Sequence, residues 1–288
     1  MNHRELISQL TPLHGASEAR AIVRLIMEER FGLSQTDLLL GKDTTLSGRD
    51  LADFEKIASQ LLDGAPVQHV LGFADFCGHR FRITPDVLIP RPETEELVEW
   101  GKECLKTSNH QNLKSSYLLD LCTGSGCIAV SLALVCPEAR ITAVDVSEAA
   151  LAVARENAIG LGAKNINFIC ADILADTLAE IIDGLYFTML TANPPYVRNS
   201  EAADMTSTVL HYEPSLALFV PDEDPLLFYR AIARIGHHVL LPGGCILVEL
   251  NTALASDTLQ LFCNAGYADV QLRCDQFNRQ RMLCARVG

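Results

Sequence analysis

The spacing of apolar residues divides the chain into an N-terminal stretch with helical periodicity and a longer stretch in which strands and helices alternate. In the segment ASEARAIVRLIMEERFG, Ile22, Leu25 and Ile26 fall on one face of a helix that is expected to stop at Gly32. Two Ser-x-x-Asp sequences further along match the capping box that opens a helix. We therefore expect residues 1–70 to form a small helical domain.

Residues 71–93 lack the helical periodicity of the preceding segment, and their pattern predicts a β-hairpin linker. Phe73–Cys77 and Arg80–Thr84 read as two short strands on either side of a Gly-His turn, and a proline-rich link follows them. A helix is expected to begin near Thr94. The remaining residues, 94–288, are expected to form one larger domain.

From Tyr117 onward, short apolar runs alternate with amphipathic segments, which predicts strands separated by helices. The predicted strands are Tyr117–Cys122, Arg140–Asp145, Ile166–Cys170, Phe187–Ala192 and Cys245–Leu250. The chain closes with ADVQLRC and RMLCARV, two strands that have no helix between them. This order predicts an α/β fold with a doubly wound, mainly parallel, seven-stranded sheet and an antiparallel C-terminal hairpin.

The composition of the chain limits its possible cellular locations and partners. The 288 residues are 49% hydrophobic and 20% charged, which is typical of a globular protein. No apolar run approaches the ~20 residues that span a bilayer, and the N-terminus lacks the apolar core of a signal peptide. We therefore expect a cytoplasmic protein without a membrane partner.

The formal net charge is −13, and neither residues 1–80 nor residues 81–288 carry an excess of positive charge. Proteins that grip nucleic acid usually present a basic face, so we expect no direct nucleic-acid partner. The ten cysteines include no Cys-x-x-Cys pair, and most lie in apolar strands. This pattern favours buried reduced thiols and predicts no metal site.

Three consecutive strand ends carry groups suited to a nucleoside. The run LLDLCTGSGCIA passes from a buried strand through Gly124 and Gly126 into a helix, and these glycines allow a ligand to approach the backbone closely. Asp145 ends the next strand, where a carboxylate can accept protons from both ribose hydroxyls. Asp172 follows the third strand and can accept from an adenine amino group, with Ile173 packing on the ring. An adenosine-containing cofactor is predicted, which leaves a nicotinamide enzyme and an S-adenosylmethionine enzyme as alternatives.

The turn NPPY after the fourth strand favours the second alternative. Two prolines stiffen the turn, and the residue before a proline is held in extended geometry. An amide nitrogen is a poor nucleophile because its lone pair is delocalised. The side-chain oxygen of Asn193 and the carbonyl of Pro194 can accept hydrogen bonds from both of its N–H groups, and Tyr196 can stack on the planar group. The turn therefore suits a methyl acceptor with a planar NH2 group.

The motifs LIPRPETEELVE, DLCTGSGCIAVSLA, AVDVS, NPPYV, HYEPSLALF and PGGCILVEL together resemble the protein-(glutamine-N5) methyltransferases of peptide chain release factors, the HemK/PrmC family. The resemblance covers nearly the whole chain, including GAPVQHVLG near residue 70. It implies a class I S-adenosylmethionine-dependent methyltransferase with a Rossmann-like fold and a helical N-terminal substrate-recognition domain. The implied substrate is the glutamine of the Gly-Gly-Gln loop in class I release factors, which act in translation termination.

The resemblance also assigns roles to individual residues. S-adenosyl-L-methionine, with S-adenosyl-L-homocysteine as product, would be held at its methionine end by Thr123, Gly124, Ser125 and Gly126, at its ribose by Asp145, and at its adenine by Asp172 and Ile173. Cys122 and Asn193 would also contact the cofactor. The substrate amide would be bound by Asn193, Pro194, Pro195 and Tyr196. Three of these, Asn193, Pro194 and Tyr196, are the catalytic candidates.

Some positions depart from the family pattern or remain open. Cys122 stands where the family often has glycine, and we expect its backbone to be strand-like, which weakens the case for a cofactor contact through its carbonyl. Asn251 and Asn278 also replace frequent glycines, and asparagine tolerates a left-handed conformation. Arg91 and Glu95 either shape the substrate channel or pair with each other.

Two related activities remain as alternatives. A ribosomal-protein glutamine methyltransferase is expected to share these motifs. An adenine-N6 DNA methyltransferase also uses an Asn-Pro-Pro-aromatic turn on a flipped base, but it would normally carry a basic target-recognition region that this acidic chain lacks.

Overall fold

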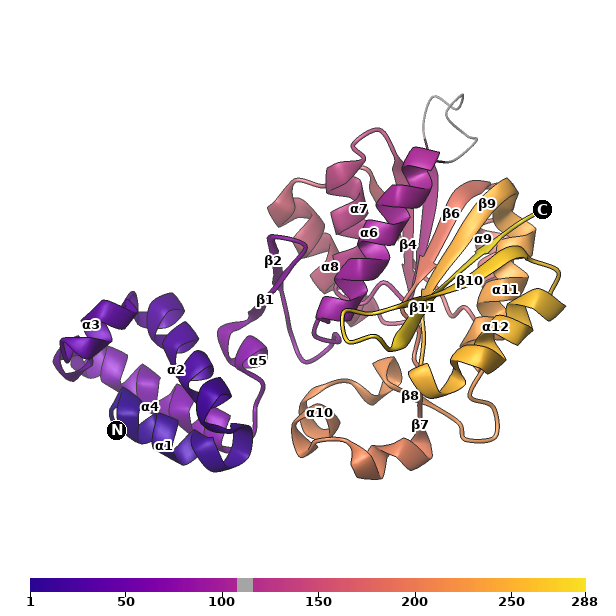
Figure 1. Cartoon of the computed structure of the whole chain (residues 1–288). Helices are drawn as coiled ribbons and strands as arrows, with labels where there is room; N and C mark the ends of the chain where they lie inside the picture. The colour runs from indigo at the N-terminus through magenta and orange to yellow at the C-terminus, as the bar shows by residue number, and fades with distance from the viewer. Residues whose placement is uncertain (108–115) are drawn as a thin grey trace. The chain divides into compact units, whose positions relative to one another are not determined.

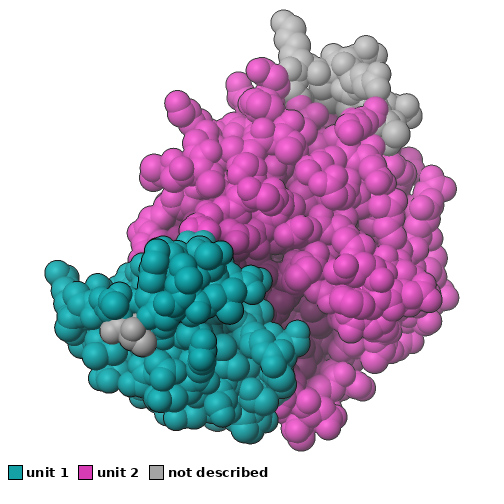
Figure 2. Space-filling model, turned by 60° about the vertical axis from the view of Figure 1, so that its left-hand side comes forward, with its two compact units in different colours: residues 1–73, 206–212 teal, residues 74–205, 213–288 magenta. Residues whose placement is uncertain are grey.

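The structure is a computed structural model that describes residues 1–107 and 116–288. The chain divides into two compact units (Figure 2). The smaller comprises Met1–Phe73 and Thr206–Tyr212, and the larger comprises Ala74–Met205 and Glu213–Gly288. A segment far along the chain thus belongs to the same unit as the N-terminal helices. None of the helices in the described residues combines the length and apolar composition needed to cross a bilayer.

The smaller unit is built from helices packed around an apolar core. Asn2 caps the first helix by accepting from two backbone N–H groups, and the capping box predicted at Ser34 is present. Phe54 packs edge-to-face on Phe31, and the hydroxyl of Tyr212 donates to the carbonyl of Asp63 over 3.2 Å. The helices are α1 (His3–His14), α2 (Ala16–Phe31), α3 (Gln35–Leu39), α4 (Gly48–Leu62), α5 (Val67–Leu71) and α10 (Ser207–Tyr212).

The larger unit contains a seven-stranded sheet in the order β10-β11-β9-β6-β3-β4-β5. Its first five strands in chain order are parallel, and the last two pair antiparallel at one edge. The predicted topology is confirmed. The strands are β3 (Tyr117–Leu121), β4 (Arg140–Asp145), β5 (Ile166–Cys170), β6 (Phe187–Ala192), β9 (Leu240–Glu249), β10 (Ala268–Cys274) and β11 (Gln280–Arg286).

Helices cover both faces of this sheet (Figure 1). One face is covered by α6 (Pro92–Thr107), α7 (Cys127–Val135) and α8 (Glu148–Leu161), and the other by α9 (Thr177–Ile181), α11 (Leu227–Val239) and α12 (Ala255–Asn264). Because both faces are buried, the central strands are continuous apolar runs, and every residue of β6 is buried. The smaller elements are β1 (Phe73–Phe76), β2 (His79–Arg82), β7 (Val197–Arg198) and β8 (Phe219–Val220).

The bounds of β1, β2, β3, β9 and β11 differ from the predicted ones, and for β3 and β9 the structure shows the reason. β3 ends at Leu121 because Cys122 has a φ of 57°, which is left-handed, so the expectation of a strand-like backbone there is wrong. β9 begins at Leu240, ahead of the predicted Cys245, because Leu240 already pairs with Phe187. The intervening Pro-Gly-Gly sequence reads as a turn but is accommodated as an irregularity in the strand register.

The strand order sets the place of a ligand site. After β3 the chain builds β4 and β5 on one side and then crosses to β6 and β9 on the other. The connections diverge where this reversal occurs, which opens a crevice at the carboxyl ends of β3 and its neighbours. The NPPY turn lies at this edge, directly after β6.

Candidate active site

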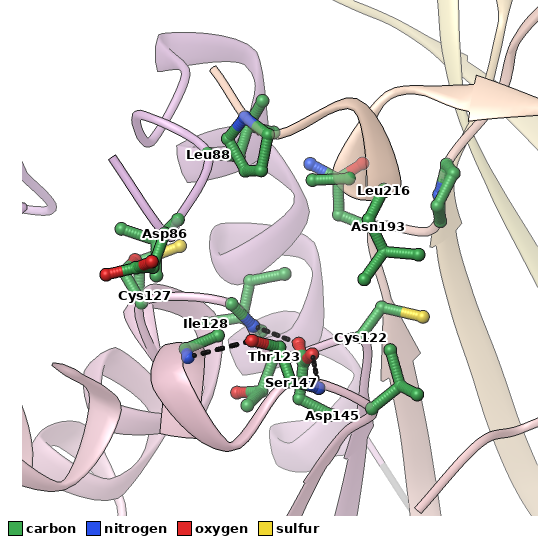
Figure 3. A pocket seen from close by; sticks show the side chains of 18 of the residues that line it. Asp86, Leu88, Cys122, Thr123, Cys127, Ile128, Asp145, Ser147, Asn193 and Leu216 are labelled. Carbon is green, nitrogen blue, oxygen red and sulfur yellow. Dashed lines mark hydrogen bonds between the residues drawn. The ribbon is translucent and has the colours of Figure 1, made fainter. Parts of the chain in front are cut away.

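A cavity of about 320 Å³ lies at the carboxyl ends of the parallel strands (Figure 3). Its volume is in the range of small-molecule sites. The predicted site residues that line it are Cys122, Thr123, Gly124, Ser125, Asp145, Asp172, Ile173, Asn193 and Pro195. The other predicted residues, Gly126, Pro194 and Tyr196, are absent from its lining.

The loop after β3 is shaped by three left-handed residues. Cys122, Gly124 and Gly126 have φ values of 57°, 55° and 79°. A Cβ on Gly124 would meet nothing within 4 Å, so glycine is favoured at this position by the left-handed backbone and not by a lack of space. A Cβ on Gly126 would lie 3.0 Å from the Cβ of Ala154, so this glycine permits close packing of the loop on α8. Gly126 therefore contributes through this packing and is absent from the lining of the cavity.

Asp145, at the end of β4, holds this loop in place. One carboxylate oxygen accepts from the backbone N–H of Gly124 over 2.8 Å, and the other accepts from Ser147 over 3.0 Å (Figure 3). Burial raises the pKa of Asp145, while these backbone hydrogen bonds lower it. Each oxygen keeps a further lone pair, and together they can accept from two vicinal hydroxyls of a ribose.

Asp120 in β3 is a buried carboxylate that the motif analysis missed. It is 1% exposed and accepts hydrogen bonds of 2.6 Å from the hydroxyls of Thr123 and Thr191. Burial raises its pKa to about 6. The available signal was a charged residue in the middle of the apolar run YLLDL. Its place beneath Thr123 makes it a support for the loop.

The third strand end combines a carboxylate with an apolar wall. Asp172 is exposed and accepts from the backbone N–H of Leu174 over 2.8 Å, whereas Ile173 is buried. Ile173, Leu174 and Phe228 all line the cavity. A planar apolar group that also carries an amino donor matches this combination. The left-handed loop, the Asp145 carboxylate and this wall together fit an adenosyl cofactor.

The NPPY turn brings Asn193 and Pro195 into the cavity and directs Tyr196 elsewhere. The half-buried ring of Tyr196 packs against the apolar core on the α11 face, and its hydroxyl donates to Glu249 over 2.9 Å. The side-chain nitrogen of Asn193 donates to the hydroxyl of Thr94 over 3.3 Å. Stacking of Tyr196 on the substrate and acceptance by the Pro194 carbonyl stay predictions.

Arg91 and Glu95 do not pair with each other. Arg91 lines the cavity, and its guanidinium contacts both carboxylate oxygens of the buried Glu213 at 2.6 and 2.8 Å. Glu95 accepts from the backbone N–H of Cys77 over 3.0 Å. Of the two asparagines that replace frequent glycines, Asn278 has a left-handed φ of 60°, whereas Asn251 has a φ of −68° and caps a short helix.

None of the ten cysteines, all of which lie within the described residues, is joined in a disulfide. Their burial is mixed, because Cys170, Cys263 and Cys274 are exposed. Within the described residues, no group of three or more His, Cys, Asp or Glu side chains is arranged to hold a metal ion.

The chain is similar to families and proteins of known type. Residues 5–72 match the model of the PrmC N-terminal domain, and residues 113–211 match that of a methyltransferase domain. The release factor glutamine methyltransferase of Bacteroides thetaiotaomicron is 41% identical, over 96% of this chain and 95% of the relative. The enzyme of the same name from Flavobacterium psychrophilum is 40% identical, over 98% and 97%.

One solved structure with a similar fold is the 16S rRNA N2 G1207 methyltransferase of Thermus thermophilus in complex with AdoMet and guanosine. The TM-score is 0.53 at 17% sequence identity, and the similarity covers 75% of this chain and 50% of that one. The similarity extends to the fold, which is that of the class I methyltransferases.

Proposed function

The chain belongs to the release factor glutamine methyltransferase family, and we propose that it methylates the glutamine of the Gly-Gly-Gln loop in class I release factors. The methyl group of S-adenosylmethionine is transferred to the side-chain nitrogen N5, and S-adenosylhomocysteine is released. The observation that carries this proposal is the convergence of a nucleoside-type site and the NPPY turn on one cavity. A substrate of the translation machinery places the enzyme in the cytoplasm.

We assign the cofactor to the groups at the first three strand ends. Asp145 accepts from the ribose hydroxyls while it keeps its backbone hydrogen bonds to the loop. Asp172 accepts from the adenine amino group, and Ile173 supplies the apolar wall. Backbone groups of Cys122, together with Thr123, Gly124 and Ser125, hold the methionine end. When bound, S-adenosylmethionine supplies an electrophilic methyl group on a positively charged sulfur.

The NPPY turn then prepares the acceptor nitrogen. The side-chain oxygen of Asn193 and the carbonyl of Pro194 accept the two N–H protons of the glutamine amide. These bonds orient the nitrogen and favour localisation of its lone pair toward the methyl group. Alignment of this kind contributes up to ~7–11 kcal/mol in well-oriented reactions. No strong base is needed at the turn, because the methylated nitrogen is positively charged and loses a proton readily.

The helical unit carries none of these groups, and we assign it the recognition of the release factor. Its sequence matches the PrmC N-terminal domain, and the cofactor groups all lie in residues 74–205 and 213–288. Recognition by a separate unit would explain how a buried turn acts on one glutamine of a folded protein.

Transfer of label from S-adenosylmethionine tests the proposal. The enzyme is incubated with a class I release factor, with the same factor carrying alanine at the glutamine of its loop, with ribosomal protein and with adenine-containing DNA. We expect label in the intact release factor alone. Label that persists in the alanine-substituted factor, or that enters ribosomal protein or DNA instead, would assign another substrate.

The variant Asn193→Ala tests the chemistry within the same assay. Loss of a well-placed polar partner costs ~2.7–4 kcal/mol in oxyanion-type sites, so the single-turnover rate is expected to fall roughly 100- to 1,000-fold. The fold should persist, because Pro194 and Pro195 still set the turn. An Asn193→Ala enzyme that works at the full rate would refute the assigned role of this side chain.

A further inference from the structure

We propose that Thr94 and Glu249 are positioning residues that hold the side chain of Asn193 with its oxygen toward the substrate. This inference rests on the proposed function, because it explains how Asn193 is kept in the orientation that amide methylation needs. The two residues come from different elements, Thr94 from the first turn of α6 and Glu249 from the end of β9. Asn193 follows β6, between them in the sequence.

The direction of each hydrogen bond follows from counting protons. The hydroxyl of Thr94 has one proton, and its oxygen lies 2.6 Å from the carboxylate of Glu249. An ionised carboxylate only accepts, so Thr94 donates to Glu249. The Thr94 oxygen then offers lone pairs to its other neighbour, the side-chain nitrogen of Asn193 at 3.3 Å. Only the NH2 end of Asn193 can satisfy that contact.

This arrangement excludes the flipped orientation of Asn193. If the amide were turned over, its oxygen would face the oxygen of Thr94, whose proton is already committed to Glu249. Two acceptors would then meet without a proton between them. The oxygen of Asn193 is therefore turned away from Thr94 and is available to accept from a substrate amide.

Burial leaves few alternatives to this pattern of hydrogen bonds. Thr94 and Glu249 are each 1% exposed, so water cannot readily replace a lost partner. A buried polar group that loses its partner is destabilising, because its desolvation is no longer compensated. Burial leaves the pKa of Glu249 raised overall, although the hydrogen bonds from Thr94 and Tyr196 and the charge of Arg281 lower it by favouring the ionised form.

Tyr196 completes the arrangement at the other end of the turn. Its hydroxyl donates to the second carboxylate oxygen of Glu249 over 2.9 Å. Both oxygens of Glu249 thus accept from groups tied to the NPPY turn, one directly and one through Thr94. The first and last residues of the turn are anchored to the same buried carboxylate. This gives Tyr196 a role in positioning that does not depend on stacking.

The decisive perturbation is Thr94→Val, compared with Thr94→Ser. Valine keeps the shape of the side chain and removes the hydroxyl, whereas serine keeps the hydroxyl. We expect Thr94→Val to lower the single-turnover rate at saturating substrate at least tenfold, and Thr94→Ser to stay within about threefold of the wild type. If valine leaves the rate unchanged, or if serine lowers it as much as valine does, the proposal is wrong.

Thr258→Val is the matched control for general stability. Thr258 is fully buried in α12 and donates a single hydrogen bond of 2.8 Å to the carbonyl of Leu254. It is absent from the lining of the cavity. We expect this variant to lower the melting temperature and to leave the rate unchanged. An equal loss of rate in Thr258→Val would mean that stability alone explains the effect of Thr94→Val.

The pair Asn193→Ala and Thr94→Val/Asn193→Ala tests whether Thr94 acts through Asn193. If it does, removing the hydroxyl has no further effect on the rate once Asn193 is gone, since coupled residues are not additive. A purely structural role would lower the rate of the double variant again. Such a further loss would overturn the proposal.

A measurement without the release factor separates this proposal from the proposed function. The side-chain NH2 resonances of Asn193, assigned by their loss in Asn193→Ala, report its hydrogen bond directly. We expect slow hydrogen exchange in the wild type and Thr94→Ser, and faster exchange in Thr94→Val. Equal exchange in all three would refute the positioning. Failure of the wild type to label any release factor would refute the function instead.

Discussion

Replacement of Asp145 should lower cofactor affinity in two ways, by removing ribose contacts and by loosening the loop that the carboxylate holds. A hydrogen bond to a charged acceptor is worth about 1.5–3 kcal/mol, which is roughly 10- to 150-fold in the dissociation constant. Asp145→Ala also frees the backbone N–H groups of Gly124 and Ser147, which its two oxygens bind at 2.8 and 3.0 Å. The loop then has to be ordered at the expense of binding energy. We expect S-adenosylhomocysteine to bind at least tenfold more weakly.

Asp145→Asn, although isosteric, should be no milder. The two carboxylate oxygens accept from different N–H groups. An amide has one oxygen and one NH2 group, so its NH2 must face either Gly124 or Ser147. Two donors then oppose each other in a partly buried place, whereas alanine only leaves a gap that water can enter.

Calorimetric titration with S-adenosylhomocysteine measures both variants, and thermal unfolding measures their stability. Asp275→Ala is the control, because this carboxylate likewise accepts from two backbone N–H groups, those of Phe277 and Arg279, each at 2.9 Å. Asp275 is absent from the cavity lining, so its loss should lower stability without changing affinity. Unchanged affinity in Asp145→Ala, or a clearly milder Asp145→Asn, would refute the reasoning.

Two further predictions concern the loop after β3. Burial raises the pKa of Asp120 from 3.8 to about 6, so its contribution to stability is present below pH 4 and is lost as the pH rises through 6. Relative to Asp120→Asn, the wild type should lose about 2 kcal/mol between pH 4 and pH 7, measured by urea unfolding with Trp100 fluorescence; a constant difference would contradict this. Cys122→Gly should relieve about 1 kcal/mol of left-handed strain, and the loss of side-chain packing and of chain stiffness should offset this gain. We therefore expect a nearly unchanged melting temperature, and a change of more than a few degrees would contradict this.

The local sequence by itself predicts most strand positions and the grouping of the site residues. The bounds of β4, β5, β6 and β10 coincide with those predicted from the sequence. Groups placed at the ends of parallel strands must meet at one edge of the sheet, so the sequence predicts that Asp145, Asp172 and Asn193 lie together. These are effects of spacing along the chain, and they depend on few distant contacts.

Tertiary packing decides the conformation of the loop after β3 and the partners of the buried polar side chains, which the motifs do not indicate. Cys122 has a left-handed backbone in the loop between β3 and α7, a conformation for which cysteine has no intrinsic preference. The pairing of Arg91 with Glu213 joins residues 122 positions apart, and the bond from Asn193 to Thr94 joins residues 99 positions apart. Such contacts depend on how whole helices and strands are stacked. Local preferences act over a few residues, whereas the partner of a buried polar group is chosen by whichever elements the packed core brings beside it.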